Sequence, residues 1–235
     1  GTGFPTAGTG VVAIPSVIDG KPVTVIGGSA FQACNSLTEV TVPASVATIG
    51  AYAFSNCSLL TSVSIPSGLT EISSGMFFNC IGLASVTIPS GVINIGANAF
   101  AGCKLLTEIA IPSGVTTIGV GAFSNCGGLS SMVVPAGVTV IPGGMFTSCS
   151  GLTSVVIQGS VTAIGNNAFQ YCSKLPTLVI PGSVTSIGRS AFADCKELAS
   201  INIPASVSVI GTVSSPNIFV NCSLVIISVT KAKLF

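Results

Sequence analysis

One unit of an internal repeat reads Leu60-Thr-Ser-Val63-Ser-Ile65-Pro66-Ser-Gly-Leu69-Thr-Glu-Ile72-Ser-Ser-Gly-Met76-Phe77-Phe-Asn-Cys80-Ile-Gly82. The unit generalises to L-x-x-V-x-I-P-x-x-V-x-x-I-G-x-x-A-F-x-x-C-x-x, and its first leucine recurs every 23 residues at Leu37, Leu60, Leu83, Leu106, Leu129, Leu152, Leu175 and Leu198. A fixed period of this size is the signature of a solenoid, in which short structural units stack along one axis.

The residue pattern also predicts the structure of one coil. Alternation places Val63 and Ile65 inward and their serine neighbours outward in a short strand, which Pro66 ends. Leu69 and Ile72 mark a second extended segment, and the glycine that usually follows the isoleucine suits a turn with positive φ. The A-F-x-x-C spacing predicts one helical turn, too short to be stable alone. Stacked copies are expected to pair their strands in parallel.

The repeat pattern predicts one domain and its boundaries. Residues 1–10 are expected to form a flexible segment and residues 11–235 a single solenoid. Within it we expect an atypical first coil at 11–36, regular repeats at 37–197, and a stretched last repeat with a C-terminal cap at 198–235. Four extra residues near 212–216 are expected to bulge as a loop, and 224–235 to contain a closing strand.

Composition excludes several classes of function. Only 6% of the residues are charged and the net charge is +1, without any lysine or arginine block, which argues against nucleic acid and anionic membranes as partners. No apolar run reaches 18 residues, so membrane insertion is not expected. No basic segment followed by an apolar one opens the sequence, which leaves export undecided.

The ten pattern positions resemble the BspA-type leucine-rich repeat over roughly residues 11–229. The resemblance implies a β-rich solenoid coiled in the right-handed sense, with parallel strands on one face and short helical or 3-10 turns on the opposite face. It also implies a secreted or cell-surface adhesin or binding scaffold, with no catalytic residue in the repeat. Departures from the pattern occur at Ser73, Met76, Pro142, Met145 and Gln158.

Two residue columns could carry chemistry but are better explained as core. Nine cysteines, eight of them 23 residues apart, lack the C-x-x-C or Cys/His clusters of a zinc site, and histidine is absent. Equivalent cysteines on stacked coils point in parallel, so we expect reduced thiols rather than disulfides. The phenylalanine column is expected to be a buried ladder of stacked rings.

No catalytic, metal or cofactor site is predicted. Hydrolytic catalysis needs a base beside a nucleophile, and the chain has neither histidine nor a G-x-S-x-G motif. Gly20-Lys21 lacks the upstream glycines of a phosphate-binding loop. Asp194 and Glu197 lie beside Lys196 in a turn, where solvated ion pairs are the simpler interpretation. The chain is therefore expected not to be an enzyme.

The outward positions of the first strand carry the one asymmetry of the surface. Its second outward column becomes apolar over four consecutive coils, beside a polar first column. Because solenoids bind partners on such extended faces, the predicted partner-binding residues are Glu108, Ala110, Ser131, Val133, Ser154, Val156, Thr177 and Val179.

Three functions remain open from the sequence. The first is a non-enzymatic surface or secreted scaffold that presents this strand face to a protein or glycan. The second is a structural extracellular subunit that associates end to end into filaments. The third is an intracellular interaction scaffold, which free thiols would suit. The sequence identifies neither the ligand nor the oligomeric state.

Overall fold

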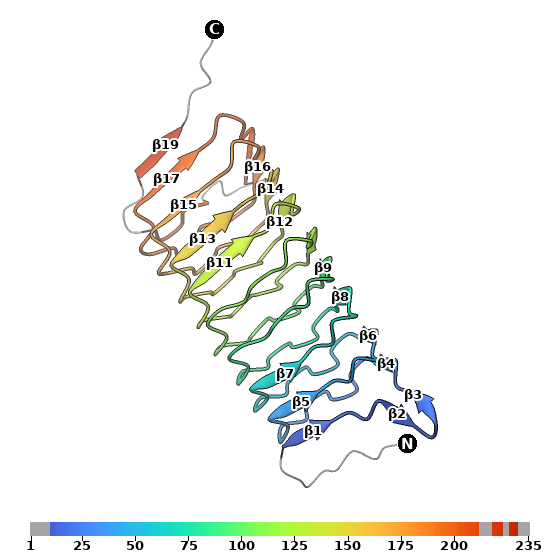
Figure 1. Ribbon diagram of the computed structural model, residues 1–235. Helices are drawn as coiled ribbons and strands as arrows, with labels where there is room; N and C mark the ends of the chain where they lie inside the picture. The colour runs from blue at the N-terminus through green and yellow to red at the C-terminus, as the bar shows by residue number, and fades with distance from the viewer. Residues whose placement is uncertain (1–9, 212–217, 223–225, 230–235) are drawn as a thin grey trace.

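The computed structural model describes residues 10–211, 218–222 and 226–229, and its chain winds into a continuous stack of coils (Figure 1). Each coil has three sides: a first strand, a second strand and a turn around the phenylalanine. The predicted β-rich solenoid is confirmed, because every strand pair that joins two coils is parallel. The coils therefore bury a single continuous core along the stack.

The first strands lie on one side of the stack. In the regular coils a residue pairs with the one 23 positions on, as in Glu39 with Ser62 and Ser131 with Ser154. This side contains β1 (Val11–Ala13), β5 (Glu39–Thr41), β7 (Ser62–Ser64), β11 (Ser131–Val134), β13 (Ser154–Ile157), β15 (Thr177–Val179), β17 (Ser200–Ile203) and β19 (Ile226–Val229).

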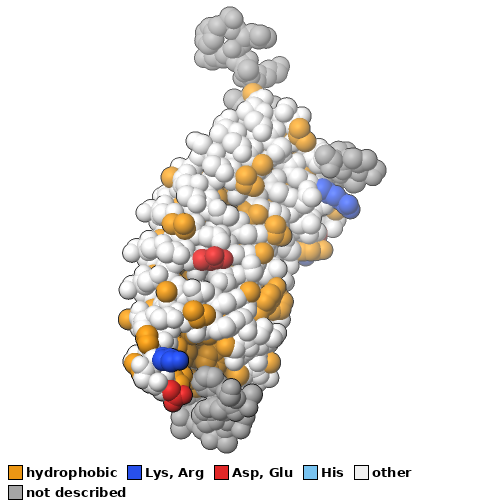
Figure 2. Space-filling view, turned by 90° about the vertical axis from the view of Figure 1, so that its right-hand side faces the viewer, with side chains coloured by type: hydrophobic (Ala, Val, Ile, Leu, Met, Phe, Trp, Pro, Cys, Tyr) orange, Lys and Arg blue, Asp and Glu red, His pale blue; other side chains and the backbone are white. Residues whose placement is uncertain are grey.

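The second strands are only two residues long and lie on another side (Figure 1). Each ends on the pattern isoleucine, which points into the core in all but the last. They are β4 (Val25–Ile26), β6 (Thr48–Ile49), β8 (Glu71–Ile72), β9 (Asn94–Ile95), β10 (Thr117–Ile118), β12 (Val140–Ile141), β14 (Ala163–Ile164), β16 (Ser186–Ile187) and β18 (Val209–Ile210). Figure 2 shows this side with few charged side chains scattered among uncharged ones.

The third side differs from the helical turn that we predicted. The described residues contain no helix, because each A-F-x-x-C segment is a hydrogen-bonded turn with a left-handed residue two positions before and two after the phenylalanine. In one coil these residues are Tyr52 at φ 58° and Asn56 at φ 59°. A left-handed residue interrupts a right-handed helix. It also lets alternate N–H groups point to the next coil: Tyr52, Phe54 and Asn56 donate to Ser74, Met76 and Phe78 carbonyls.

The glycine after the pattern isoleucine has a different role from the predicted one. Its φ is not positive in the regular coils; the left-handed residues lie further along the turn. A Cβ on Gly50 would instead lie 2.5 Å from the backbone nitrogen of Gly28 in the preceding coil. Gly96 and Gly119 meet the preceding coil in the same way. Glycine is needed here because two backbones approach closely.

The two ends of the stack depart from the repeat. The extra residues of the first coil form an antiparallel hairpin, β2 (Val17–Ile18) with β3 (Lys21–Pro22), around Asp19 and Gly20, which both have positive φ. At the other end β19 pairs with β17, which confirms a closing strand at 226–229. Residues 1–9 of the predicted segment 1–10, the loop near 212–216 and the rest of the C-terminal cap lie outside the described residues.

A ladder of phenylalanine rings fills the core beneath the turns. Ring centroids from Phe31 to Phe219 are 5.2–6.1 Å apart, and the ring planes differ by 2–24°. The seven rings from Phe54 to Phe192 are fully buried. Offset stacking at this separation is favourable for aromatic rings, so the column acts as core, as predicted.

The cysteines form a second column and are all free thiols. The Cys57 thiol donates a hydrogen bond of 3.0 Å to the carbonyl oxygen of Phe31 in the preceding coil, and this contact recurs up to Cys222 and Phe192. Burial raises the pKa of Cys57 to about 11 and the pKa of Cys80 to about 12. The column is thus a row of protonated hydrogen-bond donors as well as small apolar groups.

We expect Phe123→Ala to lower the free energy of unfolding by about 3–5 kcal/mol, because it leaves a ring-sized cavity between two stacked neighbours. Urea denaturation followed by circular dichroism measures this change. Phe78→Ala is the matched control, since Phe78 is only half-buried and contacts Tyr52 edge-on at 6.5 Å. Equal losses in the two variants would contradict the ladder's role.

We expect iodoacetamide to modify only Cys34 and Cys222 in the native protein at pH ~8, because thiolates are the reactive form and the other seven thiols are buried. After denaturation without reductant, all nine thiols should react. Intact mass measurement counts the modified groups in both states. Two or more pairs that resist alkylation after denaturation would reveal disulfides and rule out the free-thiol column.

Candidate functional site

The predicted partner-binding residues lie on the side of the first strands with their side chains exposed. Val133 on β11 is 45% exposed, Val156 on β13 is 50% exposed, and Val179 on β15 is 79% exposed. Val133 and Val156 are direct partners in the β11–β13 pair. The other five predicted residues are exposed as well: Glu108, Ala110, Ser131, Ser154 and Thr177. Their alternation with buried residues explains this placement.

The strand ladder on this side is interrupted, which the sequence did not predict. β7 is the last member of its sheet, and β11 begins the next. Two coils lie between β7 and β11. Their segments at the first-strand position, residues 85–88 and 108–111, are not strands and make no backbone hydrogen bonds in the described structure. Their N–H and C=O groups are consequently left without main-chain partners in the middle of a β-sheet face.

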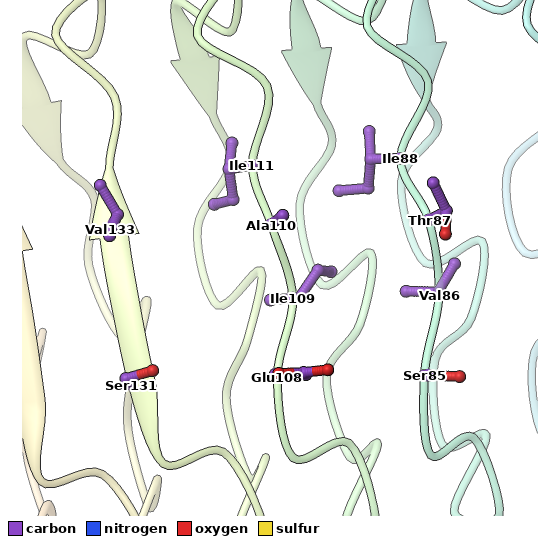
Figure 3. Close-up of a pocket in the computed structure, with 10 residues that line it drawn as sticks. All are labelled: Ser85, Val86, Thr87, Ile88, Glu108, Ile109, Ala110, Ile111, Ser131 and Val133. Carbon is purple, nitrogen blue, oxygen red and sulfur yellow. The ribbon is translucent and has the colours of Figure 1, made fainter.

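A hollow of about 540 Å³ lies at this interruption. In Figure 3 the first outward positions, Ser85, Glu108 and Ser131, form one row, and Thr87, Ala110 and Val133 form a second row beside it. Glu108 is the only charged side chain among the ten lining residues. The hollow thus joins an apolar column, a single carboxylate and unpaired backbone groups.

The interruption coincides with a departure from the repeat at Ala84. In several other coils the residue after the pattern leucine has a hydroxyl group that binds the previous coil: Thr61 donates to the Thr38 carbonyl at 3.0 Å, and Ser130 to the Thr107 carbonyl at 3.2 Å. Ala84 has no hydroxyl group, and neither its N–H nor that of Thr107 donates to the preceding coil. The backbone hydrogen bonds that this position donates in other coils are therefore absent at two consecutive junctions.

A second interruption separates β13 from β15, which belong to different sheets. Pro176 precedes β15 and has no N–H to donate to the preceding coil. A smaller hollow of about 320 Å³ lies on β15 and β17, lined by Thr177, Val179 and Asn202 among others. The predicted face therefore runs from one hollow across the paired strands β11 and β13 to the other.

The described groups with shifted pKa values lie apart from this face. The strongly shifted thiols are in the core, where burial raises the pKa of Cys103 and Cys149 well above its usual value. Over the described part of the chain, no group of three His, Cys, Asp or Glu residues could hold a metal ion. The described residues also contain no helix that could cross a membrane.

Asp194 does not form the ion pair with Lys196 that the sequence suggested. Its carboxylate accepts a hydrogen bond of 3.0 Å from the side-chain amide of Asn221 in the next coil. Asn79 donates in the same way to the side chain of Asn56 at 3.2 Å. These polar contacts link the turns of successive coils and stabilise their stacking.

Two solved structures share this architecture. A leucine-rich repeat protein of T. pallidum is 35% identical, with a TM-score of 0.65; the match covers 71% of this chain and 78% of that one. A leucine rich cell surface protein of Faecalibacterium prausnitzii A2-165 is 29% identical, with a TM-score of 0.51; this match covers 93% of this chain and 69% of that one. No curated protein matches the sequence.

A family model described as the BspA type leucine rich repeat region matches residues 24–153 and 94–226 in six copies. These matches span the regular coils, including both interruptions of the strand ladder. The repeat pattern, the parallel coils and the structural likeness agree, and the chain belongs to the BspA-type leucine-rich repeat family.

Proposed function

We propose that this chain is a non-enzymatic binding scaffold, secreted or on a cell surface, that presents the first-strand face from Glu108 to Val179 to a partner. The observation that carries the proposal is the exposed column of Ala110, Val133, Val156 and Val179 beside the hollow at the interrupted ladder. Exposed apolar groups on a solenoid face are typical of interfaces.

The chemistry of the face favours a protein over a glycan. Polar groups of a partner could hydrogen-bond, through the hollow, to unpaired N–H and C=O groups of residues 85–88 and 108–111. Its apolar side chains would cover the valine column, and a lysine or arginine could reach Glu108. A glycan has fewer apolar groups to match three exposed valines.

The proposed location rests on likeness to a related protein. The protein of F. prausnitzii that shares the fold and 29% of the aligned residues is a leucine rich cell surface protein. The small number of charged residues is compatible with this location, because serine, threonine and asparagine side chains hydrate the surface. Adhesion to a host or to another cell is the form of binding that a surface scaffold of this kind would serve.

We expect Val133→Glu with Val156→Glu to weaken binding of an extended peptide at least about tenfold, because each carboxylate would be desolvated against the partner. Peptides selected from a displayed random library against the native protein provide the ligands, and biolayer interferometry measures their affinity. The melting temperature of the variant should remain close to that of the native protein, since both side chains point to solvent.

The matched control is Val140→Glu with Ala163→Glu. These residues are also direct partners in adjacent strands, β12 and β14, so their carboxylates repel each other as in the test variant. They lie on the side of the second strands. If both double variants lose binding equally, or neither does, the first-strand face is not the binding surface. If the native protein bound glycans and no peptide were selected, a glycan rather than a protein would be favoured as the partner.

A second candidate function is end-to-end association into a structural filament. The first coil leaves Val17 52% exposed, Ile18 53% exposed and Val25 59% exposed, and among the described strands β4 pairs with β6 alone. An open strand edge with apolar neighbours can accept another chain. Head-to-tail contacts produce filaments when the rotation between units does not close a ring.

For this candidate we expect particle size to grow with concentration, and Ile18→Glu with Val25→Glu to reduce the particle to a monomer. Light scattering over a concentration series up to millimolar measures both. Val133→Glu with Val156→Glu should leave association unchanged, because that face lies away from the ends. A native protein that stays monomeric throughout the series would exclude the filament.

A further inference from the structure

A second hollow lies on the turn side of the solenoid, away from the strand face. Its volume is about 470 Å³, and it spans the turns of three successive coils. The lining side chains that bear polar groups are all uncharged amides or hydroxyls: Ser124, Asn125, Thr147, Asn166, Asn167 and Gln170. Val120 is the only apolar side chain among the lining residues. This volume is in the range of small-molecule binding sites.

The hollow lies where two consecutive coils lack a side chain at one repeat position. The position two residues before the phenylalanine holds Tyr52, Gly75 or Asn98 in earlier coils and Asn167 in a later one. In the two coils between Asn98 and Asn167 it holds Gly121 and Gly144, both with positive φ. The Asn98 side chain lies over Gly121, whereas the Asn167 side chain borders the open space above Gly144.

The floor of the hollow is rigid. Gly121 N–H donates to the Gly143 carbonyl at 3.0 Å, Asn125 N–H to the Thr147 carbonyl at 2.7 Å, and Gly144 N–H to the Asn166 carbonyl at 2.8 Å. The stacked rings of Phe123 and Phe146 lie in the core, with centroids 6.1 Å apart. A site with this support is preorganised, so binding would order few additional groups.

Several lining side chains have hydrogen-bonding groups without a protein partner. The amides of Asn125 and Gln170 and the hydroxyl of Ser124 make no side-chain hydrogen bond within the described structure. An amide side chain offers two donors and an acceptor on neighbouring atoms, and a hydroxyl offers one donor and an acceptor. This spacing of donors and acceptors complements vicinal hydroxyl groups.

We propose that this hollow, between Gly121 and Gln170, binds a neutral saccharide. A charged ligand would lack a counter-charge among the lining residues, and an apolar ligand would leave the amides unpaired. A sugar presents uncharged hydroxyl groups that both donate and accept, which matches the lining. The site is on a different side from the partner-binding face, so each proposal can be tested independently of the other.

Titration with maltotriose, cellotriose and lactose, followed by amide chemical shifts of the labelled protein, tests the site. We expect at least one of these sugars to shift the amides of Gly121, Thr147 and Gln170. Triglycine and glucuronate are the comparison probes, which should shift them much less. A larger response to triglycine would identify a peptide site and overturn the saccharide assignment.

Gly144→Asn should abolish the saccharide-induced shifts, because it fills the hollow with the residue that other coils carry at this position. The backbone accepts it: Asn98 and Asn167 have φ of 54° and 56°, and a Cβ on Gly144 would lie 3.4 Å from the Thr147 hydroxyl oxygen. Ser29→Asn is the matched control, since Ser29 has the same repeat position and φ 56° in the first coil.

Ser124→Ala with Gln170→Ala should weaken saccharide binding about tenfold by removing two hydrogen-bonding groups. Both alanines fit the fold, because Ala101 and Ala193 occupy the same repeat position in other coils. Circular dichroism confirms that each variant is folded. Binding that survives both Gly144→Asn and the double alanine variant, or no shift with any of the three sugars, would overturn the proposal.

Discussion

Three backbone hydrogen bonds at each junction between the turns from Phe31 to Phe192 hold the coils together. They run from the phenylalanine and from the residues two positions on either side, as with Phe77, Gly75 and Asn79, to the next coil. Two of the three donors are left-handed, which turns their N–H groups along the axis of the stack. Glycine and asparagine are frequent at these positions, as at Gly75 and Asn79, because they adopt positive φ most readily.

The turn-side ladder explains how the first-strand ladder can be interrupted. At the junctions around residues 85–88 and 108–111 the turns keep their bonds, as in Phe77 N–H to Ala99 and Phe100 N–H to Ala122, both 2.8 Å. The phenylalanine rings and the cysteine thiols join the same coils beneath those turns. Because one side of the coil secures the spacing, the strand side can open without breaking the core.

The sequence predicted the fold from its period and its inward positions. Val63, Ile72 and Phe77 were placed correctly in the core because burial of apolar groups repeats in every unit. The helical turn was wrong because i to i+3 spacing fits a series of tight turns as well as a helix. The positive φ predicted at glycines such as Gly50 was wrong. Sequence alone does not distinguish a glycine that is needed for positive φ from one that is needed because two backbones approach closely.

The candidate surfaces were predictable only in part. Alternation places Val133 and Val156 on the surface, so the composition of that face can be read directly from the repeat. The hollow beside them depends on hydrogen bonds that fail to form near Ala84, which a residue pattern does not encode. The turn-side hollow depends on Gly121 and Gly144 being neighbours in space, which becomes visible only once the coils are in register.

Both hollows lie beside residues that depart from the repeat. The hollow of the strand face lies next to Ala84, where most coils have serine or threonine, and the hollow of the turn side lies over Gly144, where other coils have a larger residue. The apolar pattern positions vary less, because their side chains form one continuous core; Met76 and Met145, which replace alanine, are still buried in it. In a solenoid the fold therefore depends on what the repeats share, and a binding site has to be built from the positions where they differ.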